Sequence, residues 1–406
     1  MRLPVHRWFR YSAGYSANWV ETLIKDKKQF VSNLAVLDPF AGIGTTLVAS
    51  NVQKIRSFGF EAHPFIYRIA RTKLRAIELD DREAIELYDE FFSTVITYTK
   101  QINLPDSPLI QKCYSEDALT DLITLRDVFL SKFDFATPYS ELLWVTITSI
   151  LRACSTAGTA QWQYVLPNKT KSKVLAPYEA FKDKANQIIS DIQYTKQNNW
   201  PQMAQLIQTD SRIPSFNPSE EINFVITSPP YPNNYDYADS TRLEMMFWEE
   251  ISGWADLQSR VRQYLVRSCS QHSAAERLEL ETLLEAPVLA PIREELADAC
   301  DKLATIRLTK GGRKTYHTMA AAYFKDLGDV LHALNSIVSK TAEMCFVIGD
   351  SAPYGIYLPV DRWLGELALE AGFSSYHFEK IRDRNTKWKN RKHSVPLKEG
   401  HLWITR

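Results

Sequence analysis

The chain has 406 residues, and 48 Lys and Arg side chains balance 48 Asp and Glu side chains, so its formal net charge is zero. Hydrophobic residues make up 45% and charged residues 24%, a composition that can bury a core and that excludes a wholly disordered, collagen-like or disulfide-scaffold protein. No stretch approaches the roughly 20 apolar residues of a membrane helix, and we expect no signal peptide. Five scattered cysteines without a CxxC pair indicate a reducing compartment, so we expect a cytoplasmic protein that binds no metal.

Short apolar runs alternate with helical patterns along the chain, which is typical of a parallel sheet covered by helices. Residues 34–38 and 57–61 are expected strands that each end in an acid, and residues 45–52 between them are expected to be the start of a helix. The other expected strands are 204–210, 223–227, 345–349, 375–378 and 402–405, and expected helices are 319–338 and 360–371. The long polar stretches between them show helical spacing, clearest at 83–99 and 117–133.

A glycine-containing turn lies where the first strand should meet its helix, in the sequence Asp-Pro-Phe-Ala-Gly-Ile-Gly-Thr. Gly42 and Gly44 lack Cβ atoms and can adopt positive φ, so the backbone can approach a ligand closely. Glu61 ends the second strand, where a carboxylate binds ribose hydroxyls in dinucleotide folds. A lone GxG is more often a tight turn, but these features together favour a ligand. Since no third glycine completes the phosphate fingerprint, a nucleoside without a pyrophosphate fits better.

A second motif, Ser228-Pro229-Pro230-Tyr231, follows the expected strand at 223–227. Two prolines cannot continue a strand, so they form a rigid corner at its carboxyl end, the edge at which open α/β sheets bind ligands. The Ser228 hydroxyl and the Pro229 carbonyl can accept the two protons of a nucleobase amino group while Tyr231 stacks on the base. A proline turn with a packed tyrosine is the alternative.

Together the two motifs resemble the amino-methylating DNA methyltransferases of the N4-cytosine/N6-adenine family, in their Ser-Pro-Pro-Tyr type. The resemblance implies a Rossmann-like class I methyltransferase fold and the cofactor S-adenosylmethionine, held by Asp38, Phe40, Gly42, Gly44, Thr45 and Glu61. It assigns catalysis to Ser228, Pro229, Pro230 and Tyr231. Serine at the first position is commoner among the cytosine-N4 enzymes, so the resemblance favours cytosine N4 over adenine N6.

Three further segments extend the resemblance. An aromatic segment at residues 8–16 resembles one that flanks the cofactor, with Tyr11 as its candidate contact, and Asp210 resembles the acid near the cofactor's adenine amino group. Asn234 and Tyr235 continue the second motif and are candidates for contact with the flipped base or its neighbours. Aromatic packing and a cap or turn aspartate are the ordinary alternatives for the first two.

Basic residues gather in three segments, near 169–173, 307–314 and 380–392. Their candidates for phosphate contact are Lys169, Arg313, Lys314 and Lys389. A solvated surface is the safer explanation for any one segment. Three such segments beside an expected base pocket favour a nucleic acid as the partner, and the resemblance implies double-stranded DNA with a flipped base.

We therefore predict one α/β catalytic domain with a seven-stranded, mostly parallel sheet and two helical insertions. The predicted parts are a cofactor half (1–80), an insertion (81–205), the target-base motif (206–240), an insertion that is a candidate for target recognition (241–315) and a C-terminal part (316–406). The long first insertion departs from most members of the family and leaves open where target recognition is housed. An RNA base N-methyltransferase and a catalytically degenerate nucleic-acid-binding protein are the alternatives. Cytosine C5 methylation is disfavoured, because the chain has no Pro-Cys.

Overall fold

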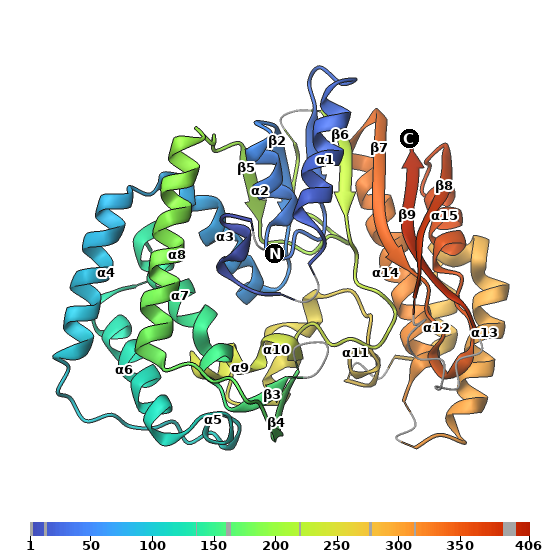
Figure 1. Ribbon diagram of the computed structural model, residues 1–406. Coiled ribbons are helices and arrows are strands. Elements are labelled where there is room, and N and C mark those ends of the chain that lie inside the picture. Colours follow the sequence, from blue (N-terminus) through green and yellow to red (C-terminus); the bar gives the residue numbers. More distant parts are fainter. Residues whose placement is uncertain are drawn as a thin grey trace.

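The computed structural model describes residues 3–11, 14–134, 136–159, 164–218, 221–275, 278–311, 314–384 and 395–406. Within these residues a seven-stranded sheet forms the centre of the molecule, in the order β5-β2-β1-β6-β7-β9-β8 (Figure 1). Its strands are β1 (Ala35–Asp38), β2 (Arg56–Phe60), β5 (Ala204–Ile207), β6 (Ile222–Thr227), β7 (Val338–Gly349), β8 (Ser375–Arg384) and β9 (Leu397–Thr405).

The first five strands of the sheet are parallel, whereas β9 pairs antiparallel with both β7 and β8. This arrangement confirms the predicted α/β class with a mostly parallel, seven-stranded sheet. All four residues of β1 are buried, as expected for a parallel strand with neighbours on both sides and helices on both faces.

Both faces of the sheet are covered by helices. On one face Val36 of β1 packs in a cluster with residues of α1 (Ala17–Lys28) and α2 (Thr45–Val52). On the other face Leu37 packs with residues of α13 (Arg293–Arg307), α14 (Tyr316–Ile337) and α15 (Val360–Glu370). Successive residues of β1 thus point to opposite faces, because side chains alternate along a strand.

Residues 81–205 form a mostly helical layer that packs beside α3 (Pro64–Leu74), on the left in Figure 1. Its helices are α4 (Asp81–Ile96), α5 (Pro108–Cys113), α6 (Glu116–Lys132), α7 (Pro138–Cys154) and α8 (Pro177–Gln197). This stretch also contains an antiparallel pair of strands, β3 (Ala157–Thr159) and β4 (Val165–Thr170), which we did not predict. The sequence of β4 includes Pro167, Asn168 and Lys169 and lacks the alternation that identifies a strand.

Residues 241–315 divide between the two sides of the molecule. The helices α9 (Arg242–Phe247) and α10 (Leu257–Arg260) pack in the cluster that includes the 81–205 layer. The helices α12 (Leu280–Leu284) and α13 pack on the α14 face of the sheet, and α11 (Ser270–Ala275) lies between the two groups along the chain. Short 3₁₀ turns complete the fold: η1 (His6–Trp8), η2 (Arg75–Glu78), η3 (Asp239–Thr241), η4 (Trp254–Asp256), η5 (Arg262–Tyr264), η6 (Pro287–Ile292) and η7 (Pro353–Gly355).

The five cysteines are free and buried. Among the helices that the structure describes, none has both the length and the apolar character that a bilayer crossing requires.

Candidate active site

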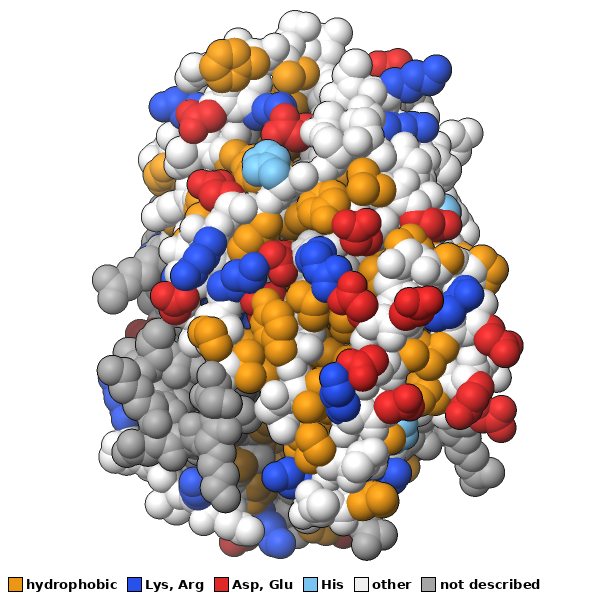
Figure 2. Space-filling view, turned by 90° about the vertical axis from the view of Figure 1, so that its right-hand side faces the viewer, with side chains coloured by type: hydrophobic (Ala, Val, Ile, Leu, Met, Phe, Trp, Pro, Cys, Tyr) orange, Lys and Arg blue, Asp and Glu red, His pale blue; other side chains and the backbone are white. Residues whose placement is uncertain are grey.

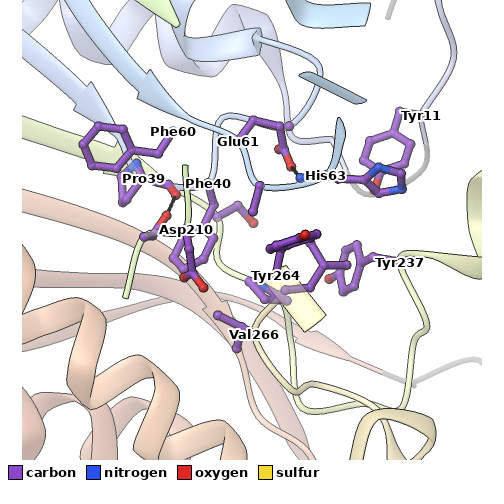
Figure 3. Close-up of a pocket in the computed structure, with 16 residues that line it drawn as sticks. Tyr11, Pro39, Phe40, Phe60, Glu61, His63, Asp210, Tyr237, Tyr264 and Val266 are labelled. Atoms are coloured by element: carbon purple, nitrogen blue, oxygen red, sulfur yellow. Dashed lines mark hydrogen bonds between the residues drawn. The ribbon is translucent and has the colours of Figure 1, made fainter. Parts of the chain in front are cut away.

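A pocket lies at the carboxyl ends of β1, β2 and β6, where the expected cofactor loop and the expected target-base motif meet. We call it the first pocket; the predicted site residues that line it are Tyr11, Phe40, Gly42, Glu61, Asp210, Ser228 and Pro230. Figure 3 shows Glu61 and His63 on one side and Tyr264 and Val266 on the other. Two segments that are far apart in the sequence are therefore brought to one rim of the sheet, as parallel topology requires.

Asp38 lies behind the glycine turn and outside the lining of the first pocket. Its buried carboxylate accepts hydrogen bonds from the Phe40 amide (3.0 Å), the Thr46 hydroxyl (2.5 Å), the Tyr15 hydroxyl (3.0 Å) and the Thr227 hydroxyl (2.7 Å). Burial raises the pKa of Asp38, and the hydrogen bonds oppose that rise. The carboxylate thus ties the turn after β1 to α2 and to the end of β6, and it can act on a cofactor only through the loop that it holds.

The turn itself has left-handed backbone at both glycines. Gly42 has a φ of 53° and lines the pocket, whereas Gly44 has a φ of 80° and begins α2 as its N-cap. A Cβ on Gly44 would lie 3.4 Å from the Cβ of Ala70 on α3, so the helix packs closely against the turn. Gly44 and Thr45 do not line the pocket. Gly44 lies on the α3 side of the turn, and both residues determine the conformation of the loop.

Glu61 is a pocket-lining carboxyl at the end of β2. It accepts a hydrogen bond from the His63 amide (2.7 Å), and burial raises the pKa of Glu61 to about 7. The ring of His63, which also lines the pocket, pairs through Nε2 with the Thr241 hydroxyl at 3.0 Å, and burial lowers the pKa of His63 to about 3. His63 is thus an uncharged residue in the pocket wall, a role that we did not predict. The sequence feature that could have indicated it is its position two residues after Glu61.

Asp210 lines the pocket and forms a salt bridge with Arg212. The Nε atom of Arg212 lies 3.0 Å from both carboxylate oxygens, and its Nη2 atom lies 2.6 Å from Oδ2. Arg212 also contacts buried Asp326 of α14 (3.2 Å), which accepts from Arg267 (2.5 Å). This ionic network fixes the segment that precedes Arg267 over the pocket.

Three residues of that segment, Tyr264, Leu265 and Val266, form part of the pocket wall. Sequence reasoning missed them, because they carry no motif and lie far along the chain from both expected site segments. Tyr11, on the opposite flank, is a lining residue as expected, with a buried ring whose pKa is raised by desolvation.

The four residues of the second motif are divided between the pocket and its support. Ser228 and Pro230 line the first pocket, and the Ser228 hydroxyl lies 3.5 Å from the Val347 carbonyl and also hydrogen-bonds with the Tyr231 side chain. Pro229 is buried, and Tyr231 lies outside the lining, with the guanidinium of Arg384 5.1 Å from its ring centroid. Burial raises the pKa of Tyr231 to about 12, so its hydroxyl is protonated.

The loop after the motif is internally packed. Asn234, with a φ of 64°, accepts hydrogen bonds at Oδ1 from the amide (2.8 Å) and hydroxyl (2.6 Å) of Ser270. Tyr235 is buried, and its ring meets those of Tyr164 and Tyr237. The structure therefore gives both residues a role in holding the loop, and their contact with a nucleic acid stays a prediction.

The basic segments are only partly described. Lys169 on β4 and Lys314 before α14 are exposed, whereas Arg313 and Lys389 lie outside the described residues. On the face that contains β8 and α15, Lys and Arg side chains are interspersed with Asp and Glu (Figure 2). The phosphate contacts expected of these four residues also stay a prediction.

One buried group could be considered for a metal ion. Asp236, Cys269 and His272 each place a potential ligand atom within 4.8 Å of the others. The Asp236 carboxylate is, however, already paired with the buried guanidinium of Arg262 (2.7 Å), which would repel a cation. Burial also raises the pKa of Cys269 to about 12, which disfavours the thiolate that binds metals. The expectation that the protein binds no metal stays a prediction.

The chain is similar to known methyltransferases. No protein-family model matches the chain. Type II methyltransferase M.BsoBI of Geobacillus stearothermophilus is 24% identical over 425 residues, which cover 94% of this chain and 81% of that protein. Type II methyltransferase M.AvaI of Nostoc sp. (strain PCC 7120) and M.AvaI of Anabaena variabilis are each 25% identical over 403 residues, covering 91% of this chain and 79% of theirs. The resemblance to methyltransferases that the two motifs predicted is therefore confirmed along nearly the whole chain.

Proposed function

We propose that the protein is a DNA methyltransferase that uses S-adenosylmethionine to methylate the exocyclic amine of a flipped base. The observation that carries this proposal is the first pocket, where Gly42 and Glu61 of the cofactor segment lie together with Ser228 and Pro230 of the target-base motif. Its relatives, which are named Type II methyltransferases, support the coarser part of this proposal, that the protein is a methyltransferase. We keep cytosine N4 as the preferred target over adenine N6, on the serine of the motif.

The residues of the first pocket fit the cofactor. The left-handed turn at Gly42 leaves room beside the backbone, and the Glu61 carboxyl reaches the pocket from the end of β2, where ribose hydroxyls can donate to it. Asp210 can accept from an adenine amino group, and Phe40 offers an apolar face. When bound, S-adenosylmethionine supplies an electrophilic methyl group on a sulfonium.

The second motif would orient the acceptor. The Ser228 hydroxyl oxygen and the Pro229 carbonyl accept the two protons of the target amine and hold its nitrogen at the pocket, while the Tyr231 ring stacks on the base. Acceptors outside the base plane favour a pyramidal nitrogen, so the lone pair is directed toward the cofactor. Orientation is then the main contribution of the protein. The nitrogen becomes acidic once it is alkylated, and its proton passes to solvent without a strong general base.

The substrate assignment rests on identifying the product. The protein would be incubated with isotopically labelled cofactor and, separately, with DNA and RNA, which are then digested to nucleosides for mass analysis. N4-methylcytosine from DNA is expected, and N6-methyladenine from DNA would move the target to adenine. Label in RNA alone would select the RNA alternative. No label from either, although cofactor binding is measurable, would select the degenerate binding protein.

Cofactor affinity should depend on the ionisation of Glu61. Because the pKa of Glu61 is raised to about 7, the carboxyl is protonated below neutrality and loses acceptor strength toward ribose hydroxyls. We expect the affinity for S-adenosylmethionine to fall about tenfold from pH 8 to pH 6, measured by titration calorimetry. Glu61→Gln should bind more weakly with a flatter profile, since any ionisation of the ligand itself is common to both proteins. Parallel pH profiles for the two proteins would contradict the role of Glu61.

A further inference from the structure

The ring of Tyr231 is contacted by a residue from β8, the edge strand of the sheet. Arg384 ends β8, and the centre of its guanidinium lies 5.1 Å from the Tyr231 ring centroid, within the range of a cation–π contact. The guanidinium is itself fixed, because Nη1 donates to the Asp350 carbonyl (2.7 Å) and Nε lies 3.6 Å from Oε2 of Glu399. The Arg384 side chain is 15% exposed.

The last residue of β7 leaves the space that this packing needs. A Cβ on Gly349 would lie 2.6 Å from Nη1 of Arg384 and 3.2 Å from Cε2 of Tyr231. The bare backbone of Gly349 thus borders both side chains, and a larger residue would displace one of them. The contact between Arg384 and Tyr231 therefore depends on two positions in the sheet, Arg384 on β8 and Gly349 on β7.

A neighbouring arginine provides the contrast. Arg382, on the same strand, pairs with the same glutamate, Glu399, at 2.6 Å, but its side chain is 66% exposed. Pairing with Glu399 is therefore common to both arginines and does not explain why one of them would act on Tyr231. Arg384 differs by being shielded, by donating to the backbone at the end of β7, and by facing the Tyr231 ring.

We propose that Arg384 is a positioning residue that fixes the Tyr231 ring for stacking on the target base. The role rests on the proposed function, since it assigns Arg384 to the same target-base site. Arg384 acts through Tyr231 and touches neither the cofactor nor the reacting atoms. It also lines a second pocket with Pro232 and Asn233, the two residues that directly follow Tyr231 in the chain.

The test compares Arg384→Met with Arg382→Met, each of which removes a cation and keeps an unbranched apolar chain. With labelled cofactor and plasmid DNA, Arg384→Met should lower kcat about tenfold while KM for DNA changes less than about twofold. Arg382→Met should leave kcat within about twofold, and any effect should fall on KM and its salt dependence. Gly349→Ala, which retains the arginine, should lower kcat in the same way as Arg384→Met.

A double-mutant cycle separates positioning from a general structural effect. In a Tyr231→Ala background, Arg384→Met should cause no further loss of kcat, because the residue through which it acts is gone. A further tenfold loss in that background, or a rise in KM with kcat unchanged, would overturn the positioning role. Absence of DNA methylation by the wild-type protein would instead refute the proposed function, and the role of Arg384 with it. Unchanged thermal melting of Arg384→Met serves as the folding control.

Discussion

Gly44→Arg is expected to abolish binding of S-adenosylmethionine. Gly44 has a φ of 80°, which a residue with a Cβ adopts only with strain, and its Cβ would already lie 3.4 Å from that of Ala70. An arginine side chain must therefore displace α3 or change the conformation of the loop that contains Gly42, which lines the pocket. We expect no heat of cofactor binding by titration calorimetry at concentrations that saturate the wild-type protein.

The matched control is Gly253→Arg. A Cβ on Gly253 meets no described atom within 4 Å, and its φ of −169° is extended backbone that any residue adopts. This variant adds the same charge and volume to the surface and should bind the cofactor as the wild-type protein does. Normal cofactor affinity in Gly44→Arg would show that the turn does not cradle the cofactor.

Ser228→Ala is expected to lower turnover about 100-fold while cofactor affinity stays within about twofold. The Ser228 hydroxyl lines the first pocket, lies 3.5 Å from the Val347 carbonyl and hydrogen-bonds with the Tyr231 side chain, so its removal takes away an acceptor for the amine and a contact of the stacking ring. The loss should therefore fall on the orientation of the target amine. Single-turnover methylation of DNA at saturating cofactor measures it.

Ser228→Asn provides the companion measurement. Its side-chain carbonyl restores an acceptor at the same position, so we expect part of the lost turnover to return. Equal loss of cofactor binding in Ser228→Ala and Gly44→Arg would contradict the separate roles of the two motifs.

The framework of the fold could be predicted because its signals are local. The strand β1 is a short apolar run next to a turn, and α2 begins at the predicted residue, Thr45. The strands β7, β8 and β9 extend beyond the predicted segments 345–349, 375–378 and 402–405, because their outer parts are polar and carry no apolar run. The β3–β4 hairpin could not be predicted, since β4 is polar and its pairing depends on tertiary contacts. The division of residues 241–315 between two packing clusters likewise could not be predicted, because it depends on which apolar surfaces the rest of the fold leaves exposed for these helices to cover.

The lining of the first pocket could be predicted only where one motif gave both the residue and the direction of its side chain. Glu61 lines the pocket as expected, because a residue at the carboxyl end of a parallel strand faces the ligand edge. Asp38 ends its strand in the same way, but its carboxylate turns inward to four donors. Sequence position alone does not distinguish these two directions. The network from Arg212 through Asp326 joins distant segments and leaves no local pattern.

The strand order places β9 between β7 and β8, although β9 follows both of them in the chain. During translation, β8 emerges before the only sheet partner that the described structure gives it, so this edge stays unpaired until β9 is made. Arg384 and Glu399 lie on these two strands, so the packing around Tyr231 is completed only after both strands have been made. A nascent chain that has already formed its glycine turn would therefore still lack the packing around Tyr231 until β9 has left the ribosome and inserted between β7 and β8.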